Sequence, residues 1–105
     1  MTNYNPPLSD INFCIRHLAN IKDILSFDAF EGMEPEDLEQ VLEEAGKFSS
    51  DVVAPTNIPT DQQGCRLEGN TVHVADVLAD VHRQFVENGW QAVAGDPEYD
   101  GMGLP

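Results

Sequence analysis

The chain has 105 residues and carries 19 acidic against 5 basic side chains, a formal net charge of −14. This excess of negative charge argues against binding to nucleic acid or to an anionic membrane surface, because both need clustered Lys and Arg. The hydrophobic fraction of 41% is typical of a globular domain, and with neither a signal peptide nor an apolar run of about 20 residues we expect a cytoplasmic protein.

Apolar residues recur at helical spacing near the start of the chain. The stripe consists of Leu8, Ile11, Cys14, Ile15, Leu18, Ile21 and Leu25. This spacing predicts one helix over residues 9–25. Cys14 then lies on the apolar face, where cysteine behaves as a small hydrophobe. The pattern breaks over residues 26–33, with Gly32 as the predicted turn.

The second predicted helix begins at Pro35, a residue suited to the first helical position, and two acidic residues follow it at the positive end of the helix dipole. Its apolar stripe consists of Leu38, Val41, Leu42, Ala45, Phe48 and Val52. We expect Pro55 to end this helix, because the residue before a proline is displaced from the α region. Phe48, in the middle of the stripe, is predicted to be buried against Phe85 of the next helix.

Residues 56–73 are predicted to form a loop, in which 66–73 can pair as a very short β-hairpin around a Gly-Asn turn. The third predicted helix covers residues 75–88, and Gly89 is placed just after its end. Three amphipathic helices predict an all-α fold, a small helical bundle forming a single domain over residues 1–105.

Nine acidic residues and the single basic residue Lys47 lie between positions 28 and 51. The simplest interpretation is a solvated helix face that confers solubility. The alternative is an acidic surface that mimics DNA or docks a basic partner.

The histidines and cysteines do not form a recognisable site. His17, His73 and His82 are not spaced as pairs of metal ligands, so we predict no metal site. Cys14 and Cys65 are 51 positions apart and neither belongs to a C-x-x-C pair. Both are expected to be free thiols, with Cys65 the more exposed. We also predict no catalytic and no cofactor-binding residue in the chain.

The final segment, 91–105, is predicted to be a connecting loop that leads into the rest of a longer protein, because Gly and Pro punctuate it. Asp96, Glu98, Asp100 and Gly101 match the first positions of a calcium-binding loop. The twelfth position, a glutamate in such loops, would lie beyond Pro105, and a proline interrupts the loop, so calcium binding is not expected.

Five blocks of sequence together resemble the N-terminal region of the acyl-CoA dehydrogenases. The blocks are 42–48 (LEEAGKF), 53–57 (VAPTN), 61–65 (DQQGC), 85–90 (FVENGW) and 96–105 (DPEYDGMGLP). The resemblance is strongest to the bacterial branch that has an extra N-terminal helix and includes the methylthiopropanoyl-CoA dehydrogenase-like enzymes.

This resemblance implies a flavoprotein in which an all-α N-terminal domain precedes a β-barrel domain and a C-terminal helical bundle. It implies that FAD is bound by the absent domains, that a glutamate of the C-terminal bundle removes the α-proton of an acyl-CoA thioester, and that the complete enzyme is a homo-oligomer. The segment in hand is implied to scaffold the oligomer and to wall the acyl pocket, with Tyr99, Gly101 and Gly103 as pocket residues. Alone it is expected to be inactive.

Two residues of the last block depart from the branch, which usually reads Tyr-Gly-Gly-Gln-Gly-Leu-Pro. Asp100 replaces the first glycine and Met102 replaces the glutamine. Because Asp tolerates the left-handed conformation better than most residues, we expect the turn to survive. The rival hypothesis is a stand-alone acidic helical module with an interaction or regulatory role.

Overall fold

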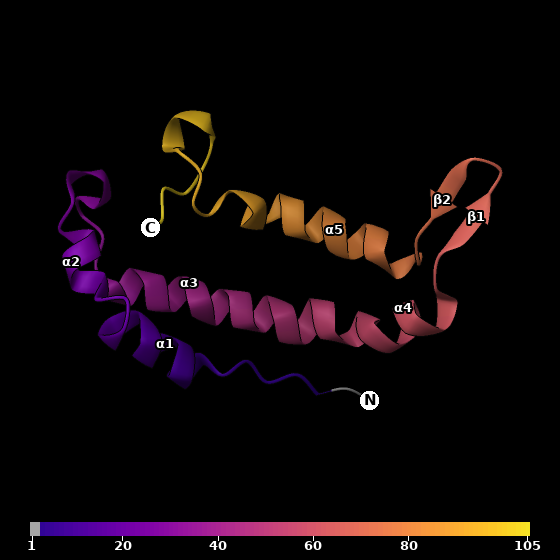
Figure 1. Cartoon of the computed structure of the whole chain (residues 1–105), viewed down its shortest axis with the longest axis horizontal. Helices are drawn as coiled ribbons and strands as arrows, with labels where there is room; N and C mark the ends of the chain where they lie inside the picture. The colour runs from indigo at the N-terminus through magenta and orange to yellow at the C-terminus, as the bar shows by residue number, and fades with distance from the viewer. Residues whose placement is uncertain (1–2) are drawn as a thin grey trace.

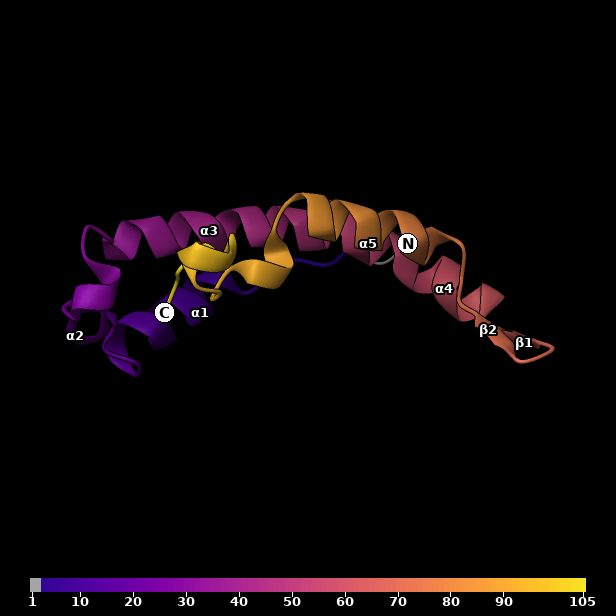
Figure 2. The ribbon, with the colours of Figure 1, turned by 90° about the horizontal axis from the view of Figure 1, so that it is seen from above.

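The computed structural model describes residues 3–105, and its order of elements confirms a mostly helical fold with one short hairpin. The helices are α1 (Leu8–His17), α2 (Ile21–Leu25), α3 (Pro35–Phe48), α4 (Asn57–Gln63) and α5 (Val77–Glu87). Helices α1, α3 and α5 lie side by side, with α2 at one end of the molecule and the hairpin at the other (Figure 1). Seen from above, they make one thin, slightly curved layer (Figure 2).

The single helix expected over residues 9–25 is wrong, because the structure divides it into α1 and α2. Asn20 between them has φ +52°, the left-handed conformation that asparagine adopts more readily than most residues. This turn reverses the chain and buries Ile21, which is 4% exposed, while Leu18 is left 75% exposed. The helical spacing of apolar residues therefore continues past Asn20, whereas the helix itself is interrupted there.

Helix α3 begins where the sequence predicts. Pro35 occupies its first turn, and the backbone N–H of Glu34 donates to the carboxylate of Asp37 at 2.8 Å in a reciprocal capping box. The expectation that Pro55 ends the helix is wrong. The backbone widens into a π turn over Ser49–Val53, tightens over Ala54–Thr56 and continues into α4. Pro55 lies in the first turn of the 3-10 segment Ala54–Thr56, a position at which a proline is tolerated because its backbone N–H is not needed.

The loop expected over residues 56–73 is therefore partly helical, whereas the hairpin within it is confirmed. Strand β1 (Arg66–Glu68) pairs antiparallel with β2 (Thr71–His73), and Leu67 lies opposite Val72. Gly69 in the turn has φ +59°. Helix α5 matches the third predicted helix apart from its end residues, and Gly89 follows it with φ +78°.

The C-terminal loop folds back on itself through short helical turns at Trp90–Ala92 and Pro97–Tyr99. The N–H of Gly103 donates to the carbonyl of Gly95 at 2.9 Å, and the N–H of Met102 donates to Ala92 at the same distance. Asp100 has φ +63° and ψ +21°, so the left-handed turn expected there is confirmed.

The layer encloses almost no core of its own. Ile21 and Ala75 are the only buried hydrophobic residues among those the structure describes. The radius of gyration is 17.4 Å, whereas a compact chain of this length has about 13 Å. The accessible surface of 7767 Å² is roughly 1,900 Å² above that of a typical globular protein of this mass. The fold therefore leaves apolar side chains in water that a compact domain would cover.

The N-terminal segment packs on α3 at Gly46, which is buried. A side chain there would lie 3.0 Å from Cγ of Pro6 and 3.4 Å from Cδ1 of Leu8. We expect Gly46→Leu to lower the free energy of unfolding by about 2–3 kcal/mol through overpacking. Gly46→Ala is the control, because its small strain is offset by a helix-propensity gain of about 1 kcal/mol. Chemical denaturation of both variants measures the difference, and equal stability of the two would contradict this packing.

Candidate functional site

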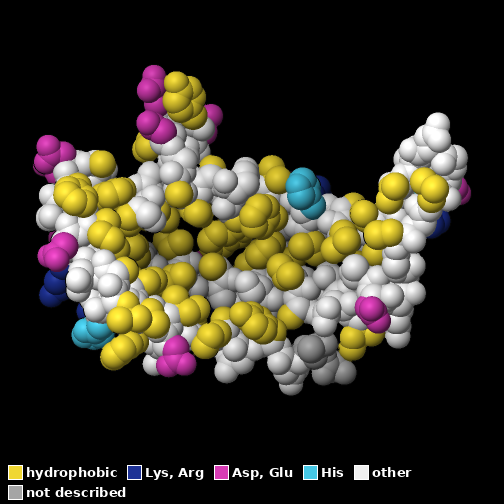
Figure 3. All heavy atoms as spheres, in the orientation of Figure 1, with side chains coloured by type: hydrophobic (Ala, Val, Ile, Leu, Met, Phe, Trp, Pro, Cys, Tyr) yellow, Lys and Arg dark blue, Asp and Glu magenta, His cyan; other side chains and the backbone are white. Residues whose placement is uncertain are grey.

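A cavity of about 640 Å³ lies along the seam between α3 and the end of α5. Its apolar lining comes from both sides, with Val41, Phe48 and Val52 on the α3 side and Trp90 and Met102 beyond α5. Hydrophobic side chains gather along the strip between these helices (Figure 3).

A second cavity of about 550 Å³ adjoins the first and shares Asp51 and Val52 with it. Its far wall is the first half of α5, including Val81 and Asp80. We call the two cavities together the α3–α5 groove. The groove has an apolar floor and a polar rim. The floor residues are Val41, Phe48, Val52, Val81, Trp90 and Met102. The charged rim residues are Asp37, Glu44, Lys47, Asp51 and Asp80.

Three aromatic rings hold the two walls of the groove together. The ring centroid of Phe48 is 6.3 Å from that of Phe85 and 6.1 Å from that of Trp90, within the range of favourable tilted pairs. The predicted contact between Phe48 and Phe85 is thus present. Their predicted burial is wrong, because Phe48 is half-buried and Phe85 is 38% exposed. The stripes of α3 and α5 face each other, but no third layer covers them in residues 3–105.

The rim of the groove is strongly negative. Lys47 pairs with Glu44 at 2.7 Å, and this carboxylate raises the pKa of the lysine. On the opposite rim the guanidinium of Arg83, followed by the amide of Gln84, lowers the pKa of Asp80, so this carboxylate stays charged at a lower pH than an ordinary aspartate. Asp51 has no ion-pair partner within residues 3–105.

The three residues expected to wall an acyl pocket lie in the C-terminal loop and outside the lining of the groove. Tyr99 is 79% exposed. Gly101 and Gly103 allow parts of the loop to pack closely together. A side chain on Gly101 would overlap the carbonyl of Gly95, and one on Gly103 would lie 3.0 Å from Pro97. Their neighbour Met102 lines the groove instead.

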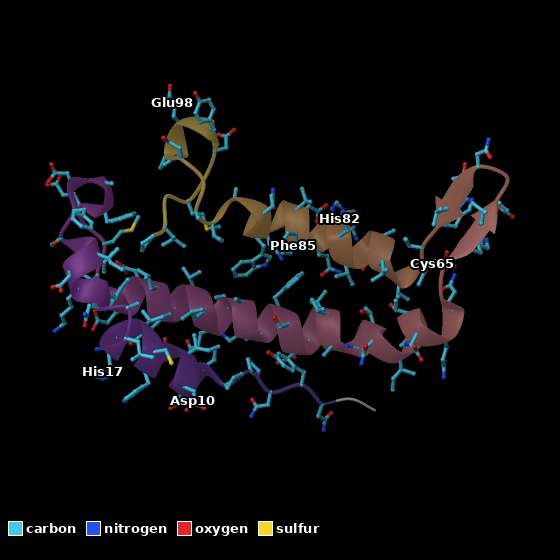
Figure 4. The ribbon with its side chains drawn as sticks, viewed as in Figure 1. Asp10, His17, Cys65, His82, Phe85 and Glu98 are labelled. Atoms are coloured by element: carbon cyan, nitrogen blue, oxygen red, sulfur yellow. The ribbon has the colours of Figure 1, made fainter. Side chains whose placement is uncertain are left out.

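The three histidines lie on separate elements, and the labelled side chains of His17, His82 and Cys65 are far apart in Figure 4; Cys14 shares α1 with His17. Both cysteines are free and exposed, so the apolar-face position predicted for Cys14 is wrong. The half-buried apolar residues of α1 include Leu8, Ile11 and Ile15, and Cys14 lies outside this face.

The incomplete calcium pattern has a local explanation. The side chain of Asp96 accepts a hydrogen bond from the N–H of Glu98 at 2.9 Å and so caps the turn that follows. Within residues 3–105 no group of three or more His, Cys, Asp or Glu side chains is arranged to hold a metal ion.

Comparison with known proteins shows what the chain is similar to. The chain is 34% identical over 102 residues, 97% of its length, to a 3-methylmercaptopropionyl-CoA dehydrogenase of Ruegeria pomeroyi. The chain matches a segment of an acyl-CoA dehydrogenase. This confirms the resemblance expected from the five blocks, while the chain spans 17% of that relative's length. No protein-family model matches the chain.

The groove itself was not anticipated from the sequence, although a signal for it exists. Asp37, Glu44 and Asp51 recur every seven residues beside the apolar stripe of α3. Such spacing keeps the three carboxylates on one side of the helix, at the edge of its apolar face. The groove presents carboxylates, one amine and apolar surface, which equip it to bind a partner. None of the helices described in residues 3–105 is long and apolar enough to span a membrane.

Proposed function

We propose that the chain is the N-terminal helical segment of a longer, FAD-dependent acyl-CoA dehydrogenase that forms the α,β double bond of an acyl-CoA thioester. The observation that carries this proposal is the 34% identity that extends over 97% of the chain. The relative's name specifies a 3-methylmercaptopropionyl thioester, and we propose a short acyl-CoA of this chemical class as substrate. The complete enzyme is proposed to be a cytoplasmic homo-oligomer.

The residues of this segment do not suit the cofactor. FAD and coenzyme A both carry phosphates, whereas the rim of the α3–α5 groove holds four carboxylates and one amine. Such a rim repels a phosphate instead of neutralising it. The flavin site therefore belongs to the proposed remainder of the polypeptide, to which we also assign the general base.

The role we assign to the segment is that of a wall and a scaffold. The C-terminal loop is held in a fixed shape by backbone hydrogen bonds and presents Tyr99 outward. We propose that Tyr99, Gly101 and Gly103 form part of the wall of the acyl pocket, with the glycines giving the loop its shape. The exposed apolar surface of the layer supports this role, because a wall between domains needs an apolar face on which they pack.

The test compares the product of the natural gene with the 105-residue chain alone. We expect the gene product to carry a flavin absorption band and to reduce an artificial electron acceptor when supplied with an acyl-CoA. The chain alone should be colourless and inactive even with added FAD, because it has no dinucleotide-binding motif and no assignable general base. A gene product without flavin or dehydrogenase activity would refute the proposal and favour the stand-alone acidic module.

A further inference from the structure

We propose that the α3–α5 groove receives an amphipathic helix of about 14 residues, with Lys or Arg beside its apolar stripe, from the remainder of the longer polypeptide. This inference rests on the proposed function only in requiring that such a remainder exists. Beyond that function, the inference specifies the chemistry of the segment that covers the exposed helices.

The dimensions of the groove fit a helix. Asp37 and Asp51, the first and last charged residues on the α3 side of the groove, are 14 residues apart, which corresponds to about 20 Å along a helix axis. The two walls are themselves roughly parallel rods (Figure 1). A third helix laid along such a seam contacts both walls through one apolar stripe, as in a bundle.

The floor offers anchors for that stripe. Phe48 and Trp90 present half-buried rings, and Met102, a flexible side chain that adapts to different partners, is 43% exposed. The indole Nε1 of Trp90 is buried and donates to no acceptor within residues 3–105. A buried donor without an acceptor is costly, so a partner that supplies a side-chain or carbonyl oxygen here gains stability from it.

The rim selects a basic partner. Of the four rim carboxylates, Glu44 is paired with Lys47 and Asp80 with Arg83. Asp37 and Asp51 have no ion-pair partner within residues 3–105. Covering the groove with an apolar or acidic segment would leave Asp51 desolvated and unpaired. A Lys or Arg on the α3 side of the incoming stripe pairs Asp37 and Asp51 as the floor is covered.

The same charges disfavour a second copy of this segment as the occupant. Each copy carries a net charge of −14, and acids outnumber basic residues 19 to 5. Two such surfaces brought together repel each other. The alternative occupant is a segment of the same, longer polypeptide, since the matched segment is 17% of the relative's length.

Photo-crosslinking in the natural gene product tests the occupant. Gln40 lines the groove and is exposed, so a photoreactive benzoylphenylalanine placed there samples whatever covers the floor. The same residue placed at Glu43, exposed on α3 but outside the lining of the groove, is the matched control. We expect Gln40 to form a link within one polypeptide, to a helical segment beyond residue 105 that carries Lys or Arg, and Glu43 not to reach that segment.

A double variant that removes two negative charges from the rim tests the role of those charges. Glu44→Gln with Asp51→Asn should lower the yield of the Gln40 link about tenfold. Asp28→Asn with Glu31→Gln removes the same charge away from the groove and should leave the yield unchanged. Linkage to a second copy, to a separate protein, to an acidic segment or to nothing would overturn the inference, as would an unchanged yield in the Glu44/Asp51 variant.

The flavin content of the same preparation separates this inference from the proposed function. A flavin-containing, active protein without the expected link refutes the docked helix and leaves the function standing. The expected link in a protein without flavin refutes the function and leaves the docked helix standing.

Discussion

Phe48→Ala should destabilise the 105-residue chain by about 2–3 kcal/mol. Phe48 is the one ring that contacts both Phe85 and Trp90, so its removal separates the two walls of the groove. The cost is below the upper range for a fully buried phenylalanine, because half-exposed rings have less transfer free energy to lose. A chain with so small a core has little stability in reserve, so the loss is a large fraction of the total.

Chemical denaturation followed by emission of Trp90, the single tryptophan, measures this loss directly. Phe27→Ala is the control, since Phe27 is 63% exposed, and we expect it to cost less than about 1 kcal/mol. If Phe48→Ala costs no more than Phe27→Ala, the aromatic cluster does not join α3 to α5.

Gly101→Ala should disrupt the C-terminal loop, with a strain of about 3 kcal/mol that local unfolding relieves. The added carbon would overlap the carbonyl of Gly95, and backbone atoms cannot move aside as a flexible side chain does. The bonds from Met102 to Ala92 and from Gly103 to Gly95 would then be lost. If this loop walls the acyl pocket, the same variant of the complete enzyme loses activity several-fold.

Amide chemical shifts of residues 92–104 and the rate of proteolysis within them measure this disruption. Gly32→Ala is the matched control, because Gly32 has φ +86° but nothing within 4 Å of the added carbon. We expect it to cost about 1 kcal/mol from backbone strain alone. Native shifts in Gly101→Ala would show that the loop adopts another path.

Local chemistry made several parts of the fold predictable. Pro35 and the acidic first turn marked the start of α3, and the Gly-Asn turn marked the hairpin. Gly89 and Asp100 were both expected at left-handed positions and have φ +78° and +63°. Each of these signals acts within a few residues, so the rest of the fold does not override it.

The failures share a different cause. The stripe from Leu8 to Leu25 predicted one helix, because apolar spacing indicates which residues are to be buried but not where the backbone turns. Pro55 was predicted to end the helix, but a π turn over Ser49–Val53 precedes it, and the chain stays helical through the proline. The stripes also identified Phe48 and Phe85 correctly as facing residues, while the sequence could not reveal that no layer covers them within residues 3–105.

Hydrogen exchange on the isolated chain and on the natural gene product tests most directly whether this layer is one part of a longer protein. In the isolated chain we expect residues 95–105 to exchange fastest, because the short turns that bond their amides are mostly exposed to solvent. We expect Pro35–Phe48 to exchange slowest, because α3 has its own cap and stripe. In the gene product, residues 95–105 and both walls of the α3–α5 groove should become protected. Slow exchange throughout residues 95–105 of the isolated chain, unchanged in the gene product, would contradict this and identify a complete, stand-alone module.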